Sequence, residues 1–436
     1  MSDQHLNIFW FRRDLRLIDN RGLYEALRSG RQVLPLFIFD EDILSELPAG
    51  DHRVEYIHLQ LQQLEKELAS LGSGLLVKKG RPLDVFVSLL KDYQVEAVYT
   101  NGDHEPYGQK RDEKVRALLE SQGISLESQT DHLIFDKNRV LKPDGSPYLV
   151  FTPYSKQWKA RLSSRDLSPF PSQEKLDHLW KGNIPSLPDL QALGFKSSGM
   201  AMPSFTVRED IIRKYDRTRD FPAMEGTSRL GTQLRFGVLS IRDLVKNAGK
   251  WNEVFLNELI WREFYAMVLW HFPHVVRSSF KPVFDRLPWL NGEVAFSKWK
   301  AGMTGYPMVD AGMRQLSQTG YMHNRLRMVT ASFLTKHLMV DWRWGEAWFA
   351  EKLFDYELSS NNGGWQWSAG TGCDAAPYFR VFNPTEQQKK FDQDGTFIRE
   401  WVPEAGSPDY PDPIVDHKMA RERWLKTVKE LVSSQR

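Results

Sequence analysis

The sequence predicts an α/β N-terminal domain, built as a doubly wound parallel sheet, which a long linker joins to an all-α domain. Short apolar runs alternate with helical patterns up to about residue 130, which is typical of a parallel sheet with crossover helices. Pro, Gly and Ser are scattered through residues 131–200, and strand patterns are absent from 201 onward. We therefore expect domains at 1–130 and 201–436, with a linker at 131–200.

The predicted sheet is based on short runs of apolar, β-rich residues. They are Leu6–Phe11, Val33–Phe39, Leu75–Lys78 and Ala97–Thr100. Helical patterns lie between them, and Val54–Leu71 has apolar residues at spacings of three and four. The first run continues into charged residues (RRDLR), and no glycine-rich dinucleotide-binding or phosphate-binding motif follows it. A doubly wound sheet is therefore favoured, whereas a dinucleotide-binding Rossmann site is not.

Long helical patterns dominate the second domain, because apolar residues recur there at spacings of three and four. They cover Ser240–Ala248, Glu253–His271, Met308–Gln315, Arg325–Leu338 and Trp344–Leu353. A short charged segment near the end, Asp416–Leu431, predicts one more helix.

The chain is rich in tryptophan. Aromatic residues make up 12% of its 436 residues, and 15 of them are Trp. Such a surplus is typical of proteins that stack on flat ligands or move electrons between rings, and a large Trp-rich core is the alternative. The formal net charge is only +2, so any nucleic-acid contact would come from a local patch rather than a global basic field.

The cysteine count and the apolar runs indicate a compartment. Cys373 is the only cysteine, which excludes an intrachain disulfide and favours a reducing environment. The N-terminal residues lack the apolar segment of a signal peptide, and no run approaches about 18 uninterrupted apolar residues. We therefore expect a cytoplasmic protein without a membrane span, and we predict no metal site.

The segment NELIWREFYAM combines four chemically different residues on one helical face. They are Glu258, Trp261, Arg262 and Tyr265. Their spacing of i, i+3, i+4 and i+7 brings them to the same side of a helix, where a core stripe would have Leu, Ile or Val. The combination favours a pocket wall, and a solvated amphipathic helix with an Arg–Glu pair is the alternative.

The segment MHNRLRM contains further candidate ligand contacts. Asn324, Arg327 and Met328 share a helical face, whereas Arg325 projects elsewhere and could reach a phosphate. Upstream, Thr227 and Ser228 precede a predicted helix, where hydroxyls and free backbone N–H groups suit a pyrophosphate or simply cap the helix.

The segment FDYELSSNNGGWQW predicts an interrupted helix. Gly363 and Gly364 would break the helix and let the backbone approach a ligand closely. The two tryptophans that follow would point to opposite sides of an extended chain, one toward a cofactor and the other toward a substrate. A tight turn with two tryptophans in a core is the alternative. Further on, Arg380 is either a phosphate contact or an ordinary surface charge.

Together these segments resemble the photolyase/cryptochrome family over nearly the whole chain. WFRRDLRL resembles the family's opening strand and turn. TSRL, ELIWREFY, TGYPMVDAGMRQL, MHNRLRM, NNGGWQW and DAAPYFRVFNP follow in the family's order and resemble its flavin- and DNA-binding core. The resemblance implies that the helical domain binds FAD in a bent form.

The resemblance also implies roles for individual residues. Catalysis and the lesion pocket would involve Glu258, Trp261, Met328, Asn361 and Trp367. Flavin contacts are implied for Tyr215, Thr227, Ser228, Arg229, Leu230, Glu258, Arg262, Asn324, Arg327, Asp355, Glu357, Asn361 and Asn362. DNA contacts are implied for Trp261, Tyr265, Arg325, Met328, Trp367 and Arg380. Electron transfer from the flavin to the surface would use Trp365, Trp342 and Trp289.

Particular positions match the class I enzymes that act on cyclobutane pyrimidine dimers. Asn361 stands where plant and animal cryptochromes tend to have Asp or Cys, and Asn324 follows a single His where enzymes for (6-4) lesions have a second one. The implied activity is light-driven repair, in which the dimer is flipped out of DNA and split by an electron from photoexcited, reduced, anionic FAD. Glu258 would be protonated, with its pKa raised by burial, and would hydrogen-bond to the lesion.

Two other functions are weighed against repair. A cryptochrome photoreceptor would have the same fold without repair activity, but such sensors usually have a long C-terminal tail, and this sequence ends at Arg436. A flavoprotein that uses NAD(P)H is disfavoured because no nucleotide-binding fingerprint is present. The expected partner is DNA that contains cyclobutane pyrimidine dimers, bound by a monomer that is cytoplasmic and associates with the nucleoid during repair.

The sequence departs from the family pattern at two places. Gly231 follows TSRL where many relatives have Ser, which removes one possible hydroxyl contact to the pyrophosphate. Tyr107 and Gly108 stand where folate-binding members have an Asn-Glu pair. The second, light-harvesting chromophore therefore stays open between a deazaflavin, FMN and methenyltetrahydrofolate, or none.

Overall fold

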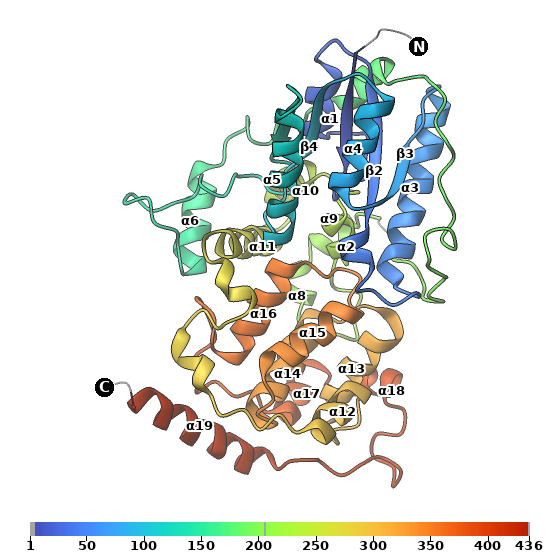
Figure 1. Ribbon diagram of the computed structural model, residues 1–436. Coiled ribbons are helices and arrows are strands. Elements are labelled where there is room, and N and C mark those ends of the chain that lie inside the picture. The colour runs from blue at the N-terminus through green and yellow to red at the C-terminus, as the bar shows by residue number, and fades with distance from the viewer. Residues whose placement is uncertain (1–4, 205, 435–436) are drawn as a thin grey trace. The chain divides into compact units, whose positions relative to one another are not determined.

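The computed structural model describes residues 5–204 and 206–434, and internal contacts divide the chain into two units (Figure 1). Unit 1 comprises Met1–Arg139, Arg161–Phe205 and Leu230–Asn247. Unit 2 comprises Val140–Ala160, Thr206–Arg229 and Ala248–Arg436. The two units therefore alternate along the chain, and the domain boundaries near residues 130 and 200 stay a prediction.

Unit 1 contains a five-stranded parallel sheet. Its strands are β1 (Leu6–Phe11), β2 (Val33–Asp40), β3 (Leu76–Gly80), β4 (Val95–Asn101) and β5 (Ser125–Gln129), in the order β3-β2-β1-β4-β5. The order reverses at β1, which confirms the doubly wound sheet. Four strands were predicted, and β5 was missed because it is an edge strand in which Leu126 is the one buried side chain.

Helices connect the strands of unit 1 and bury one face against the sheet. They are α1 (Arg21–Leu27), α2 (Glu41–Leu44), α3 (His52–Ser70), α4 (Pro82–Asp92) and α5 (Pro106–Glu120). The helix expected over Val54–Leu71 is confirmed as α3, which begins two residues earlier because the Asp51 side chain caps the N–H of Arg53. The short 3-10 helix η1 (Ser172–His178) and α9 (Gly231–Arg235) complete the regular elements that lie wholly in unit 1.

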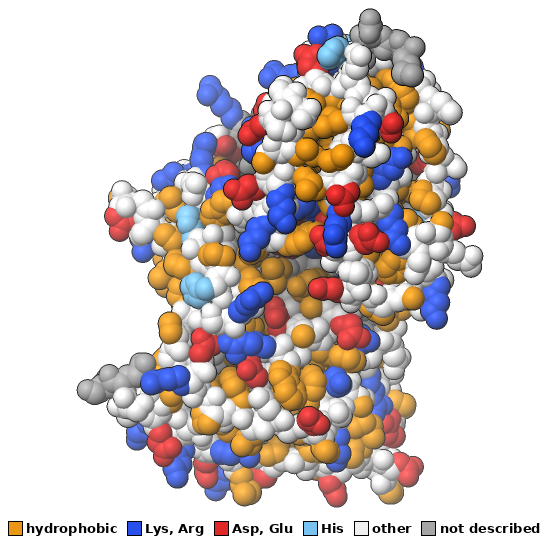
Figure 2. Space-filling view, viewed as in Figure 1, with side chains coloured by type: hydrophobic (Ala, Val, Ile, Leu, Met, Phe, Trp, Pro, Cys, Tyr) orange, Lys and Arg blue, Asp and Glu red, His pale blue; other side chains and the backbone are white. Residues whose placement is uncertain are grey.

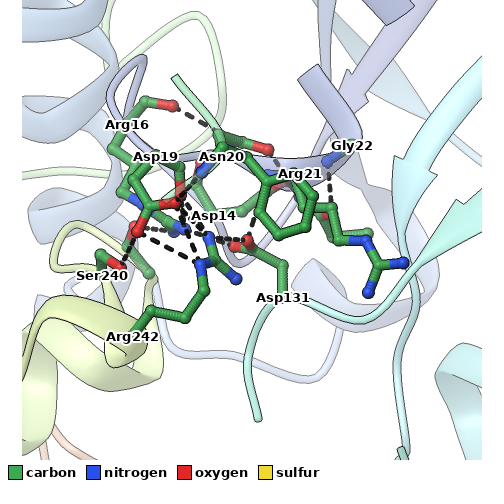
Figure 3. Close-up of polar contacts among 12 residues, drawn as sticks. Asp14, Arg16, Asp19, Asn20, Arg21, Gly22, Asp131, Ser240 and Arg242 are labelled. Carbon is green, nitrogen blue, oxygen red and sulfur yellow. Dashed lines mark hydrogen bonds and ion pairs between the residues drawn. The ribbon is translucent and has the colours of Figure 1, made fainter. Parts of the chain in front are cut away.

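A buried network of charges attaches the segment Leu230–Asn247 to the rest of unit 1 (Figure 3). Asp131 accepts hydrogen bonds from Arg16 at 2.6 Å and from Arg242 at 2.8 Å. Arg242 also contacts Asp19, and Ser240 donates to the same carboxylate. Burial alone would raise the pKa of Asp131, but the two guanidinium groups outweigh burial and hold this pKa below its usual value.

The regular elements of unit 2 are helical throughout its described residues, which confirms the all-α prediction. They are α6 (Phe151–Arg161), α7 (Glu209–Ile212), α8 (Tyr215–Thr218), α10 (Ile241–Trp251), α11 (Glu253–His271), η2 (Pro273–Val276), η3 (Pro282–Arg286), α12 (Glu293–Ala301), α13 (Pro307–Thr319), α14 (Asn324–Ser332), η4 (Phe333–His337), α15 (Trp342–Lys352), α16 (Leu358–Ala369), α17 (Pro384–Phe391), α18 (Thr396–Trp401) and α19 (His417–Ser433). The last residue of α6, Arg161, and the larger part of α10, residues 241–247, belong to unit 1.

The core of unit 2 lies among α12 to α16, whose orange ribbons pack together in Figure 1. The single helix expected over Arg325–Leu338 is wrong in one respect, because α14 ends at Ser332 and continues as the π-helix η4.

Between residues 5 and 434, apart from residue 205, every helix is too short or too polar to cross a bilayer.

The first prediction concerns the charge network of unit 1. Asp131→Asn leaves Arg16 and Arg242 buried without their shared carboxylate, so we expect the free energy of unfolding at pH 7 to fall by about 3–5 kcal/mol. Because the folded-state pKa of Asp131 lies below its unfolded value, wild type loses this advantage as the pH falls below about 4.

Urea unfolding at pH 7 and at pH 3 measures both effects. The matched control is Asp92→Asn, which alters an exposed carboxylate and should change the free energy of unfolding by less than about 0.5 kcal/mol. An equal loss for both variants, or a loss for Asp131→Asn that does not shrink at low pH, would contradict the prediction.

Candidate active site

Unit 2 contains a cavity of about 370 Å³. Helices α11, α14, α15 and α16 and the segment before α16 contribute its walls. The lining residues are Arg219, Glu258, Trp261, Arg262, Tyr265, Asn324, Arg327, Met328, Ala331, Phe349, Leu353, Asp355, Tyr356, Glu357, Ser360, Asn361, Gly364, Trp365, Trp367 and Ser368. Volume and lining are typical of a site for a flat organic ligand, because aromatic walls alternate with a few charged groups.

One wall is a single face of α11. Glu258, Trp261, Arg262 and Tyr265 all line the cavity, as expected for a pocket wall. The helix starts at Glu253 because the side chain of the N-cap Asn252 accepts from the N–H groups of the first turn. Its other faces are packed into the protein through apolar residues, so the polar face is free to line the cavity.

Two ion pairs hold the segment that leads into α16. Arg262 donates to both carboxylate oxygens of Glu357, at 2.9 and 3.0 Å. Arg327 donates to both carboxylate oxygens of Asp355, at 3.1 and 2.8 Å. The Arg262 pair is bidentate, through Nε and Nη2, and so fixes direction as well as distance, whereas Arg327 uses Nη2 alone. The start of α16 is therefore tied both to α11 and to α14.

The expected break at Gly363 and Gly364 is wrong, because α16 is helical from Leu358 to Ala369. Gly363 serves packing instead, whereas a Cβ at Gly364 would meet no neighbouring atom within 4 Å. A Cβ atom at Gly363 would lie 2.2 Å from the ring of Tyr265, so its absence lets α16 approach α11. Trp365 and Trp367, two residues apart on this helix, both line the cavity.

Trp261 belongs to an aromatic cluster that the sequence patterns did not reveal. Its ring stacks on Phe151 of α6 with centroids 3.8 Å apart and planes 6° apart. The Tyr265 ring is a tilted neighbour of the same indole, with centroids 5.3 Å and planes 36° apart. Asp374 accepts from the N–H of Phe151 at 2.8 Å and so fixes the start of α6. The stacked Phe151 ring in turn restricts rotation of the Trp261 indole and so orients it.

Glu258 pairs with Arg219, a second residue that the sequence patterns missed. Burial raises the pKa of Glu258 above its usual value, although Arg219 opposes this shift. Arg219 also lies 5.2 Å from the ring centroid of Tyr215. The four-residue spacing of Tyr215 and Arg219 within a helical turn could have indicated this neighbour.

The two neighbouring asparagines, Asn361 and Asn362, differ in whether they line the cavity. Asn361 lines the cavity and donates to the carbonyl oxygen of Glu346 at 3.1 Å. Asn362 is buried, donates to the carbonyl oxygen of Val275 at 3.0 Å and is not part of the cavity lining. Glu346 lies behind both, and burial raises its pKa to about 7.

The other expected flavin contacts of unit 2 lie outside this lining. The hydroxyls of Thr227 and Tyr321 are 3.1 Å apart, and the guanidinium of Arg229 lies 4.9 Å from the Tyr321 ring centroid. Arg229 has a φ of 51°, in the left-handed region that is uncommon for a residue with a side chain. Ser228, which lies between them, and Tyr215 are not part of the lining either, and Leu230 belongs to unit 1.

The two expected phosphate contacts differ in their surroundings. Arg325 pairs with Asp220 at 2.6 Å and lies 4.1 Å from the ring centroid of Phe391, which leaves its side chain 16% exposed. Arg380 is exposed in the segment between α16 and α17. Arg380 is therefore the more accessible of the two for a phosphate.

The three predicted electron-transfer tryptophans occupy different environments in unit 2. Trp365 lines the cavity and is 2% exposed. Gly345 of α15 makes room for it, since a Cβ there would lie 2.1 Å from the indole. Trp342 is fully buried at the start of α15. Trp289 is partly buried and stacks on Trp424, with centroids 6.1 Å apart.

Surface charges are interspersed on the face seen in Figure 2. Lys and Arg side chains alternate there with Asp and Glu rather than forming one extended field. This agrees with the small net charge of +2 and leaves local arginines, rather than a global potential, as the means of holding a polyanion.

The chain matches two protein-family models. Residues 7–174 match the model described as DNA photolyase, and residues 255–409 match the FAD binding domain of DNA photolyase. A curated relative from Synechococcus sp., called deoxyribodipyrimidine photo-lyase, is 38% identical over 97% of this chain and 96% of its own.

Two solved structures are similar to this chain over nearly its whole length. A bacterial class III photolyase from Agrobacterium tumefaciens has a TM-score of 0.88 at 32% identity, covering 99% of both chains. A cryptochrome from Synechocystis sp. has a TM-score of 0.84 at 26% identity, covering 98% of this chain and 100% of its own.

The second prediction concerns the close approach of α16 to α11. Gly363→Ala places a methyl group against the Tyr265 ring, so the helices must separate, and we expect a loss of about 1–3 kcal/mol in unfolding free energy. Gly249→Ala in α10 is the matched control, since no atom lies within 4 Å of the added Cβ. That control should stabilise the protein by up to about 1 kcal/mol. Denaturant unfolding distinguishes them, and equal effects would refute the packing role of Gly363.

Proposed function

The chain belongs to the DNA photolyase family, and from this premise we propose that it binds FAD and uses light to split cyclobutane pyrimidine dimers in DNA. The observation that supports this most is the composition of one cavity. Glu258, Trp261, Met328 and Trp367, the residues expected to hold a dimer, line the same cavity as Asn361, the residue expected beside the flavin.

The residues of the cavity fit a flavin. Its walls combine the indoles of Trp261, Trp365 and Trp367 with the amides of Asn324 and Asn361, which suits a flat ring with polar edges. The indole N–H of Trp365 is buried and has no hydrogen-bond partner within the described chain. A ligand acceptor would remove the cost of this unmet donor.

The residues that would hold the cofactor include some that line the cavity and some that lie outside its lining. Within the cavity these are Glu258, Arg262, Asn324, Arg327, Asp355, Glu357 and Asn361. Outside its lining, Tyr215, Thr227, Ser228, Arg229, Leu230 and Asn362 stay proposed contacts. The hydroxyl and guanidinium groups beside Tyr321 suit the pyrophosphate, because they offer donors to negative oxygens.

The chemistry that reduced FAD supplies when bound is light absorption followed by transfer of one electron, which returns once the cyclobutane bonds have broken. The protein's task is to hold the lesion. Trp261 and Trp367 would stack against the two pyrimidine rings, and Met328 would fill the space beside them. A dimer stacks poorly in the duplex, so it costs less to flip out than an intact step.

Glu258 would hold a proton for the lesion. Its pKa is already raised by burial, and a lesion that displaces water would raise it further. A protonated carboxyl group can donate a hydrogen bond to a pyrimidine carbonyl, where negative charge develops during cleavage. Arg219 would balance the negative charge whenever the proton is absent.

The repair activity is favoured over a cryptochrome function. The curated relatives at 36–39% identity over nearly the full chain are called deoxyribodipyrimidine photo-lyase, whereas the cryptochrome neighbour is 26% identical. The assignment to class I stays a proposal, because one close solved structure is a class III photolyase.

Several finer points are also proposals. The partner would be DNA with cyclobutane pyrimidine dimers, bound by a monomer in the cytoplasm that associates with the nucleoid during repair. The identity of a light-harvesting chromophore stays open between a deazaflavin, FMN, methenyltetrahydrofolate and none. Arg325 and Arg380 would contact phosphates, so affinity would fall as salt rises.

A direct assay tests the proposed function. The purified protein, with its FAD reduced, is mixed with an oligonucleotide that contains one thymine dimer and is illuminated with blue or near-ultraviolet light. Loss of the dimer in the light but not in the dark is expected. Unchanged lesions with FAD bound would favour the photoreceptor function instead.

The third prediction concerns Glu258. Glu258→Ala removes the hydrogen bond to the lesion, so the number of dimers repaired per photon absorbed should fall about two- to fivefold. FAD absorbance should stay unchanged, and Glu258→Gln, which keeps an N–H donor, should retain more of the yield. A wild-type yield in Glu258→Ala would remove this residue from the mechanism.

The fourth prediction concerns the proposed electron path. In Trp365→Phe, light should no longer reduce oxidised FAD, because the ring nearest the cavity becomes much harder to oxidise. Repair by protein that is chemically reduced beforehand should persist. Absorbance of the flavin under continuous light measures the first effect, and normal photoreduction would exclude a chain that starts at Trp365.

A further inference from the structure

The segment between α16 and α17, residues 370–383, contains neither helix nor strand and is here called the arginine loop. It exposes Arg380 and the ring of Phe379, which is 61% exposed. Its first part is tied to α16, because the N–H of Ala376 donates to the carbonyl oxygen of Trp367 at 3.2 Å. The main chain of the loop is therefore bonded to Trp367, a residue of the cavity lining.

Two buried side chains hold the arginine loop from inside. Nζ of Lys336 donates to the carbonyl oxygen of Arg380 at 2.8 Å. The indole N–H of Trp424, in α19, donates to the carbonyl oxygen of Tyr378 at 2.8 Å. Lys336 is 1% exposed and Trp424 is 0% exposed, so water cannot easily replace these donors.

Apolar contacts strengthen this attachment. Tyr378 and Val381 of the arginine loop pack against a core cluster that contains Trp424, Val428 and Met339. Two main-chain oxygens and two side chains of the loop therefore meet the same region of unit 2. The side chain of Arg380 is exposed, with its guanidinium 5.7 Å from the ring centroid of Phe382.

The backbone connects Lys336 directly with the cavity. Lys336 lies in the π-helix η4, which continues α14, the helix that includes Met328. A π-helical turn is rare and occurs often at functional sites. One continuous helical segment therefore contributes a cavity residue and, two turns later, the donor that holds the arginine loop.

Lys336 occupies a place that disfavours a charge. Burial, and after it the positive charge of Arg380, lower the pKa of Lys336 to about 7. The next residue, His337, has a ring nitrogen 2.8 Å from a ring nitrogen of His417, and Arg423 donates to the carbonyl oxygen of His337. Burying the amine costs stability, which its hydrogen bond to the carbonyl oxygen of Arg380 and its place 6.0 Å from the Trp424 ring centroid offset in part.

We propose that Lys336 and Trp424 are positioning residues for DNA binding, which hold the arginine loop by its carbonyl oxygens so that Arg380 meets the phosphate backbone at a defined distance from the cavity. This inference rests on the proposed function. Neither residue touches the lesion. Each acts through the loop, whose main chain would otherwise have to be ordered when DNA binds.

The test compares Lys336→Met and Trp424→Phe with wild type, each with FAD bound. Lys336→Met keeps the length of the side chain without a donor, and Trp424→Phe keeps a ring without the indole N–H. Trp299→Phe is the matched control, since it removes an equally buried indole N–H that donates to the carbonyl oxygen of Thr330 at 3.1 Å. Hydrogen exchange over residues 375–382, without DNA, reports on the loop.

We expect exchange of the loop to be about fivefold faster in Lys336→Met and Trp424→Phe than in wild type or the control. The Kd for an oligonucleotide with one thymine dimer should rise by a similar factor, with FAD content unchanged. The midpoint of thermal unfolding of Lys336→Met should not fall, because a buried amine has been removed. A purely structural role would lower that midpoint instead.

Two results would overturn the proposal. One is wild-type exchange of the loop in both variants. The other is faster exchange throughout unit 2 together with a lower unfolding midpoint, which would make Lys336 a structural residue. If wild type itself showed no preference for dimer-containing DNA, the proposed function would fail, whereas the exchange comparison would still decide whether the two donors hold the loop.

Discussion

The site depends on two charge pairs that hold one short stretch of chain. Arg262 reaches Glu357 from α11, and Arg327 reaches Asp355 from α14, so the residues before α16 are tied to two helices at once. Each pair is partly shielded from water, so removing one partner would leave a poorly solvated charge. Because α16 starts from this point, the pairs determine where Asn361, Trp365 and Trp367 of this helix lie.

Several residues of the cavity wall also hold neighbouring parts of unit 2 in place. The same arginines that hold the start of α16 also line the cavity. Two opposite effects act on Glu258. Arg219 stabilises its charged form, whereas burial raises its pKa. Aromatic rings complete the walls, and glycines at 345 and 363 allow the rings of Trp365 and Tyr265 to approach neighbouring helices.

Periodic features could be predicted from the sequence, and tertiary ones could not. β1 and α11 were predicted to the residue, because their apolar spacing is regular and their ends have clear capping or charged residues. β5 is polar and was missed. The glycine pair in α16 was misread as a break, whereas the chain is helical there and Gly363 allows close contact with Tyr265. Likewise, Phe151 and Arg219 reach the site from segments that are distant in the sequence. The spacing of Tyr215 and Arg219 indicates that these two residues are neighbours, but not that Arg219 pairs with Glu258.

The central claim is that a dimer held between Trp261 and Trp367 accepts an electron from reduced FAD in the same cavity. The fluorescence lifetime of reduced FAD in the bound complex tests this most directly. We expect the lifetime to shorten when the oligonucleotide contains a thymine dimer and to stay long with the same oligonucleotide after repair. An unchanged lifetime with dimer-containing DNA fully bound would contradict the account.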